Sequence, residues 1–153
     1  MGKVIFYQNA FAEVNNGGKL RTYAILKTGI GRVRYLDKIR NYNKRRILTK
    51  IRLSNHTLMI EKGRQKGLGK EERICPFCAE DNLDGEYHFI FECPIFNRPW
   101  RELFSKIPSA HPNFHCLPPR DKIKIVLDRE DTAEDCPIFL EKTFSVSEFL
   151  IYN

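Results

Sequence analysis

Four residues in a stretch of nineteen have the types and the spacing of a metal-binding site. Cys75, Cys78, His88 and Cys93 form the pattern C-x2-C-x9-H-x4-C. Two cysteines separated by two residues can point into one turn and bind the same ion, and the x4 spacing places His88 and Cys93 about one helical turn apart. Three thiolates and one imidazole fill a tetrahedron and select Zn2+, so we expect a structural zinc site with no open position for a substrate.

The cysteines also allow other interpretations. A thioredoxin-like redox pair needs a strand before the C-x2-C motif and a helix starting at it, whereas polar residues 71–73 precede this one. Buried cysteines at chance spacing are a further alternative. Cys116 and Cys136 lie outside the cluster, and their spacing to His111 and His115 matches no compact ligand pattern. An odd total of five cysteines argues against a disulfide framework.

Helices are the elements that must position this cluster, because apolar residues recur mainly at helical spacing. We expect helices over about residues 20–27, 32–40, 44–55, 97–107, 121–127 and 132–144, and a mobile basic loop over residues 61–70. Strands should be limited to a hairpin at the knuckle. The predicted fold is mainly α, a small helical domain organised around a zinc knuckle of short β-hairpin or turn plus helix. The expected segments are an arm or upstream fragment (1–18), a basic helical half (19–70), the zinc knuckle with the following helix (71–107) and a C-terminal helical tail (108–153).

Charge is distributed unevenly along the 153 residues. Residues 1–74 hold 18 Lys and Arg against 5 Asp and Glu, whereas residues 75–153 hold 8 against 14. A basic half of this kind attracts polyanions, nucleic acid first among them, although solvated helix faces with neutralising carboxylates would give the same composition. The candidate phosphate-binding residues are Arg45, Arg46, Lys50, Arg52, Lys62, Arg64, Lys66 and Lys70.

The knuckle itself has the opposite charge. Between Cys75 and Cys93 there is no Lys or Arg, and three thiolates outweigh the charge of a 2+ ion. We therefore expect this region to repel phosphates, so that zinc organises the fold and nucleic acid binds the basic surface before the knuckle. Tyr23, Tyr35 and Tyr42 are candidates either for stacking on unpaired bases or for the helix core. The acidic residues of the knuckle are Glu80, Asp81, Asp84, Glu86 and Glu92.

A series of motifs carries a resemblance to a known family. In chain order they are KLRTY at residues 19–23, LTKIRLSNH at 48–56, IEKGR at 60–64, ERICPFC at 72–78 and EYHFIFEC at 86–93. The series resembles the C-terminal zinc-knuckle region that follows the reverse transcriptase in non-LTR retrotransposon polyproteins of animals, over roughly residues 17 to 145. The resemblance implies an accessory nucleic-acid-binding region with Cys75, Cys78, His88 and Cys93 as ligands. Neither the polymerase motif nor the endonuclease motif of such elements occurs, so the chain looks like a detached tail or a truncated copy.

Two functions remain open at this stage. The first is a zinc-stabilised accessory module that binds RNA or single-stranded DNA with low sequence specificity. The second is a zinc-stabilised structural or protein-interaction module, which docks on an acidic partner or on the rest of a polyprotein. No pair of residues specifies an acid, base or nucleophile, so we expect no catalytic residue and no enzyme. We also expect no membrane association and an intracellular location, in the nucleus or the cytoplasm.

Overall fold

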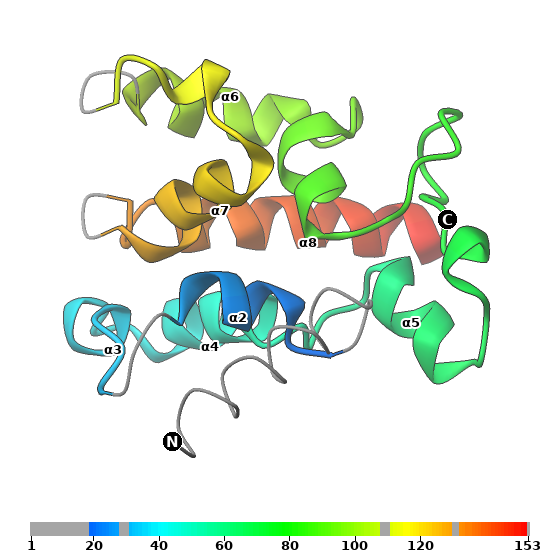
Figure 1. The fold of residues 1–153 in the computed structure, drawn as a ribbon, viewed down its shortest axis with the longest axis horizontal. Coiled ribbons are helices and arrows are strands. Elements are labelled where there is room, and N and C mark those ends of the chain that lie inside the picture. Colours follow the sequence, from blue (N-terminus) through cyan, green and yellow to red (C-terminus); the bar gives the residue numbers. More distant parts are fainter. Residues whose placement is uncertain (1–18, 28–30, 108–110, 130–131, 153) are drawn as a thin grey trace, which may run out of the picture.

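Helices make up most of the structure, a computed structural model that describes residues 19–27, 31–107, 111–129 and 132–152 (Figure 1). The mainly α fold class is thereby confirmed. The predicted arm, residues 1–18, lies outside the described residues. No helix in the described ranges has both the length and the apolar character needed to cross a membrane. The α-helices are α2 (Arg21–Leu26), α3 (Tyr35–Lys38), α4 (Tyr42–Arg52), α5 (Met59–Gln65), α6 (Asn97–Lys106), α7 (Pro119–Asp128) and α8 (Cys136–Tyr152), with short 3-10 helices η1 (Lys70–Glu72) and η4 (Phe114–Cys116) and a π-helical turn η2 (His88–Glu92).

The long helix α8 lies at the centre of the fold. It packs against α4 on one side and against α6 on the other, while α2 contacts both α4 and α7 (Figure 1). The core takes Leu48 and Ile51 from α4, Trp100 and Leu103 from α6, and Leu140 from α8, all at most 1% exposed. Buried side chains of the basic half, the knuckle segment and the C-terminal segment thus belong to one hydrophobic cluster.

Local hydrogen bonds define both ends of α4. At its start, the Asn41 side chain accepts a hydrogen bond from a backbone N–H of the first turn at 3.1 Å. At its end, the N–H of Asn55 donates to the carbonyl of Lys50 at 2.8 Å and that of Ser54 donates to Ile51 at 3.3 Å, which is the Schellman pattern. Ser54 occupies the left-handed position of this motif, with φ of 52°, where glycine is usual. The chain therefore turns sharply after α4 and leads directly into α5.

The expectation of a mobile basic loop over residues 61–70 was wrong, because its first half is α5. Ile60, Glu61 and Gly63 are buried in this helix, so its inward face is not the basic face that the composition suggested. A Cβ atom on Gly63 would lie 2.5 Å from Cγ of Arg73, which shows how closely α5 approaches the start of the knuckle. The basic composition of residues 61–70 therefore did not indicate that their first half is a helix packed against the protein.

The predicted knuckle hairpin is reduced to one contact. Among the described residues, β-pairing consists of a single antiparallel bridge between Ile74 and Leu83. The eight residues between them form bends and turns rather than strands, so the knuckle is held by turns and short helices instead.

Candidate metal centre and basic groove

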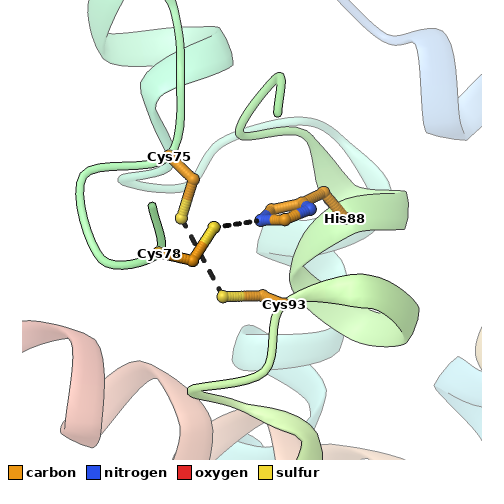
Figure 2. Close-up of side chains that lie close together, drawn as sticks. All are labelled: Cys75, Cys78, His88 and Cys93. Carbon is orange, nitrogen blue, oxygen red and sulfur yellow. Dashed lines mark hydrogen bonds between the residues drawn. The ribbon is translucent and has the colours of Figure 1, made fainter. Parts of the chain in front are cut away.

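The structure brings the four predicted ligands together. One donor atom from each of Cys75, Cys78, His88 and Cys93 lies within 4.8 Å of all the others (Figure 2). The Sγ atoms of Cys75 and Cys93 are 3.9 Å apart, and Sγ of Cys78 is 3.4 Å from Nε2 of His88. All except Cys78, which is half-buried, are buried. The group could therefore hold a metal ion away from solvent.

The donor separations fit a tetrahedral ion. Metal–sulfur bonds of about 2.3 Å and metal–nitrogen bonds of about 2.0 Å place tetrahedral ligands about 3.8 Å apart for two sulfurs and about 3.5 Å apart for sulfur and nitrogen. The observed values of 3.9 Å for Cys75 and Cys93 and 3.4 Å for Cys78 and His88 agree with these separations. Two of the six donor separations thus match tetrahedral coordination, and the other four are within 4.8 Å.

A short turn positions the first two ligands. The N–H of Cys75 donates to the carbonyl of Asn82 at 2.8 Å, next to the Ile74–Leu83 bridge, and closes the loop that carries Cys75 and Cys78. Asp81 provides the reversal with a left-handed φ of 50°, a conformation that Asp tolerates better than most residues. The loop is thus fixed at its base, and its cysteines face the second half of the site.

A π-turn positions the other two ligands. The N–H of Cys93 donates to the carbonyl of His88 at 2.8 Å, an i to i+5 bond. In an α-helix a residue five positions on is rotated by about 140° from the first, so the wider turn is what brings His88 and Cys93 to the same side. Cys93 itself is extended, with ψ of 118°, as expected before Pro94. The predicted common side is correct, but the helix type is π.

Burial of the site disfavours ionised thiols unless a cation is bound beside them. Burial raises the pKa of the Cys75 thiol to about 12, although backbone hydrogen bonds partly offset it, and burial also raises the pKa of Cys93. Buried thiolates need a positive charge beside them, which a metal supplies. Nδ1 of His88 is buried without a hydrogen-bond partner and lies 3.4 Å from a carboxylate oxygen of Glu92. Metal-bound imidazoles commonly donate their second nitrogen to such a group, so Glu92 fits the role of orienting carboxylate.

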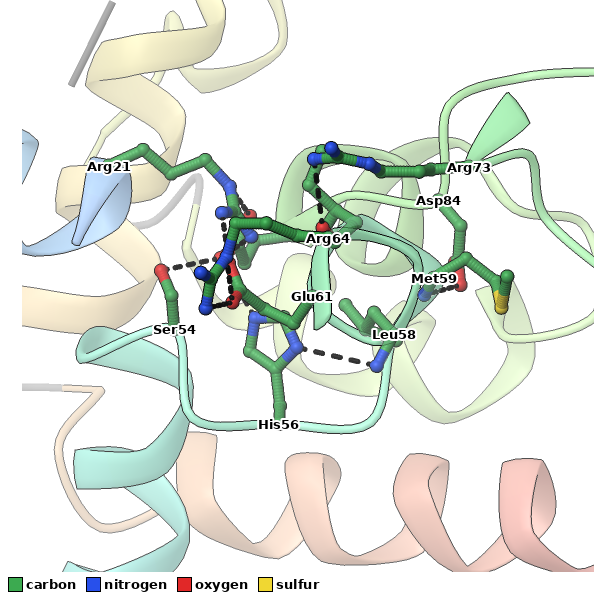
Figure 3. A network of polar contacts seen from close by, with 11 residues as sticks. Arg21, Ser54, His56, Leu58, Met59, Glu61, Arg64, Arg73 and Asp84 are labelled. Carbon is green, nitrogen blue, oxygen red and sulfur yellow. Dashed lines mark hydrogen bonds and ion pairs between the residues drawn. The ribbon is translucent and has the colours of Figure 1, made fainter. Parts of the chain in front are cut away.

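Glu86, two residues before the candidate ligand His88, is the centre of a buried polar network. Figure 3 shows Arg21, Ser54 and His56 of this network together with Glu61 and Arg64. Arg21 binds it with two parallel hydrogen bonds of 2.8 and 2.7 Å, while His56 Nε2 and Ser54 Oγ lie 2.8 and 3.1 Å from its Oε1. Burial alone would raise the pKa of Glu86, but the hydrogen bond from His56 and the charges of His56 and Arg21 hold it at about 2. The carboxylate therefore remains ionised inside the protein.

The same network reaches α5 through Glu61. Arg21 also pairs with Glu61, and Arg64 donates to the other oxygen of that carboxylate at 3.0 and 2.9 Å. Burial works against ionisation of Glu61, but the two arginines lower its pKa below the ordinary value. A carboxylate oxygen of Asp84 accepts the N–H of Met59, the first residue of α5, at 2.6 Å. These contacts connect α2, α5 and the knuckle in one unit.

The acidic character expected of the knuckle is only partly exposed to solvent. Asp84 and Glu86 are buried and bonded to the protein, so they do not repel phosphate at the surface. Glu80, Asp81 and Glu92 are exposed. The inference of phosphate repulsion therefore applies to three of the five carboxylates.

One predicted phosphate-binding residue does not lie at the surface. The Arg52 side chain is 2% exposed and donates to the carbonyl of Leu127 at 2.7 Å and to Asp128 at 2.9 Å. Its guanidinium also lies 4.7 Å from the ring centre of Tyr35, which is buried. The assignment of Arg52 to a nucleic-acid face was wrong. Residues two positions apart lie on opposite sides of a helix, so Arg52 points inward where Lys50 is exposed. Its role is to connect α4 to the end of α7.

The other predicted cations are accessible to different degrees. Arg64 is engaged with Glu61, and its side chain is 33% exposed. Among the tyrosines considered for base stacking, Tyr42, at the start of α4, is 68% exposed, whereas Tyr23 is half-buried. The remaining basic residues are half-buried (Arg45, Lys62) or exposed (Arg46, Lys50, Lys66, Lys70).

Three of these cations line one open groove. The groove has a volume of about 600 Å³ and lies between α4, the loop after it, α5 and α8. Arg46 and Lys50 reach it from α4 and Lys62 reaches it from α5, while Glu141 and Glu148 line it from α8. The groove therefore takes its cations from α4 and α5 and its carboxylates from α8.

Sequence reasoning missed the residues whose partners are distant. His56 both lines the groove and bonds Glu86, and no spacing in the sequence connects it to residue 86. A signal did exist in α8, where Glu141, Phe144 and Glu148 recur at helical spacing on one face and all line the groove.

Comparisons with known proteins provide no relative from which to interpret this site. No family model matches the chain, and neither a curated protein nor a solved structure matches it. The chemistry of the site is therefore interpreted from its own residues.

Proposed function

We propose that this chain is a zinc-stabilised accessory module that binds RNA or single-stranded DNA through phosphate contacts, with low sequence specificity. The observation that carries the proposal is the convergence of Arg46, Lys50 and Lys62, from two helices, on one groove. Within the described ranges none of the three forms an ion pair, so their charges are available to a polyanion. The resemblance to the region downstream of a reverse transcriptase supports the same function.

Binding by such a surface is driven by counterion release. Each cation that neutralises a phosphate frees a condensed counterion, and this gain does not depend on the base sequence. Lys66 and Lys70 lie beyond the end of α5, are exposed and do not line the groove. The proposal includes no catalytic step.

We infer that the metal is zinc and that its role is structural. Three sulfur donors and one nitrogen donor suit zinc, and four protein ligands leave no position for a substrate. When bound, zinc supplies a rigid cross-link. Cys75 and Cys78 would fix the loop, while His88 and Cys93 would fix the π-turn, which follows directly after the segment that holds Glu86 against Arg21 and His56.

The salt dependence of RNA binding tests the proposal. We expect the affinity of the zinc-loaded protein for a short single-stranded RNA, measured by fluorescence anisotropy, to fall steeply with salt. In the triple variant Arg46→Gln, Lys50→Gln and Lys62→Gln, the log–log slope should decrease by about 2, because each phosphate contact contributes about 0.7. The matched control removes the same charge elsewhere, with Arg98→Gln, Arg101→Gln and Lys124→Gln. Absence of salt-dependent binding, or an equal slope in the triple variant and its control, would contradict the proposal.

One observation favours the alternative, a protein-interaction module. The last turns of α8 carry apolar side chains that are 38% to 65% exposed, namely Val146, Phe149, Leu150 and Ile151. An exposed apolar patch can mark a protein interface. In that case binding of an acidic protein partner would replace oligonucleotide binding in the same salt titration.

A further inference from the structure

We infer that the groove between α4, α5 and α8 holds one unpaired nucleic-acid strand, with its phosphates along α4 and α5 and its bases turned toward α8, and that it favours bases with an exocyclic amino group over uracil. This inference rests on the proposed function and specifies the form of nucleic acid that the groove takes.

Two matching stripes form the main walls of the groove. Each stripe has the spacing i, i+3, i+4, i+7, which follows one face of a helix for about two turns, or about 10 Å. The stripe on α4 is cationic and that on α8 is anionic, and each carries one apolar residue beside its polar positions. The α4 stripe is Asn43, Arg46, Ile47 and Lys50, and the α8 stripe is Glu141, Phe144, Ser145 and Glu148.

The carboxylates of α8 decide between single and double strands. Glu141 and Glu148 are exposed, and in the part of the chain that the structure describes neither pairs with a cation. A duplex presents two rows of phosphates, and the second row would meet these negative charges. A single strand has one row, which the cations of α4 and α5 can neutralise while its bases lie away from that row. The groove therefore excludes a duplex by like-charge repulsion.

The same carboxylates favour particular bases. An ionised carboxylate only accepts hydrogen bonds, so it binds the amino groups of cytosine, adenine and guanine. Uracil has no amino group, and its single ring N–H lies between two carbonyl oxygens that repel a carboxylate. Phe144, which is half-buried, and Ile47 provide apolar surface for the face of a base. Sequence preference is thus modest and comes from the α8 wall, whereas affinity comes from the α4 and α5 wall.

Binding measurements on the zinc-loaded chain test this inference. The probes are short oligonucleotides of cytidine, adenosine and uridine, and an RNA duplex of the same length. The variant is the double substitution Glu141→Gln and Glu148→Gln, which keeps side-chain size and adds a donor. Its control is Glu102→Gln with Glu134→Gln, which removes two exposed carboxylates away from the groove.

We expect the unsubstituted protein and the control to bind the cytidine strand about tenfold more tightly than either the duplex or the uridine strand. The Glu141 and Glu148 variant should bind the duplex more tightly than the unsubstituted protein does, and its preference for cytidine over uridine should disappear. Equal affinity of the unsubstituted protein for strand and duplex, or unchanged ratios in the variant, would overturn this inference and leave the proposed function standing. Absence of binding to all four probes would overturn both.

Discussion

The metal cluster and the polar network around Glu86 adjoin one another, yet they are encoded in different ways. The four candidate metal ligands lie within residues 75 to 93, at spacings that local turns can satisfy. The network joins Arg21 to Glu86, 65 positions apart, and Arg21 to Glu61, 40 positions apart. Local spacing identifies chemistry when all partners share one turn or hairpin. It does not identify partners that meet only after helices have packed.

The two regions also differ in how their charges are balanced. Arg21 and Arg64 neutralise Glu61 and Glu86 within the protein, so these buried carboxylates need no added ion. The cysteine cluster has no cationic side chain among its ligands, and its buried thiols have raised pKa values. Ionised thiols in this cluster would need an added cation, whereas the network is balanced by its own side chains.

The largest effect should come from removing a metal ligand. Cys78→Ser should abolish the single zinc site and unfold residues 71–107, because structural zinc contributes on the order of 10 kcal/mol. Native mass spectrometry with and without chelator measures the stoichiometry, and circular dichroism measures the loss of helix. Cys116→Ser is the matched control, since Cys116 is exposed and outside the cluster, and it should keep one zinc. Full zinc loading in Cys78→Ser would disprove the ligand assignment.

A smaller but clear loss is expected when the network is broken at its centre. Glu86→Gln removes a buried charge and leaves the half-buried guanidinium of Arg21 without one of its two carboxylates, so the free energy of unfolding should fall by about 3 kcal/mol. Urea denaturation of the zinc-loaded protein measures this change, while zinc stoichiometry in native buffer should stay at one. Glu80→Gln, at an exposed position in the same segment, should change stability by less than about 0.5 kcal/mol. Equal stability of the two variants would mean that the network does not stabilise the fold.

The smallest expected effect distinguishes Arg46 from Arg52, two arginines of α4 that the sequence analysis assigned to the same nucleic-acid face. Arg52→Met should lower stability by about 2 kcal/mol, because the Leu127 carbonyl loses a buried donor, and should leave the salt slope of RNA binding unchanged. Arg46→Met should do the reverse, reducing the slope by about 0.7 with little change in stability. Thermal denaturation and anisotropy titrations on both variants check the pair. A reduced slope in Arg52→Met alone would restore Arg52 to the nucleic-acid face.

Much of the fold and the metal site could be predicted from the sequence, and the failures have physical causes. Helical spacing predicted the cores of α4, α6 and α7 because each buries one continuous stripe. It failed for α5, whose inward face includes Glu61, a carboxylate that is buried only because Arg21 and Arg64 reach it. The ligand set was predicted without the π-turn, since a spacing of five residues does not state how the intervening backbone is wound. The groove was not predicted, because the anionic stripe of α8 lies 98 positions beyond the cationic stripe of α4.

The packing of α4 against α8 also determines when this chain can fold during its synthesis. α8 is the last of the described helices to leave the ribosome, and α4 is among the first. Until α8 is made, Leu48 and Ile51 lack part of the surface that buries them in the folded chain, so we expect the basic half to remain incompletely packed. Zinc can organise the knuckle earlier, because its four ligands are all translated before α6. We therefore expect a metal held by these four residues to order the knuckle before the core is complete, and the groove to form only when translation has passed α8.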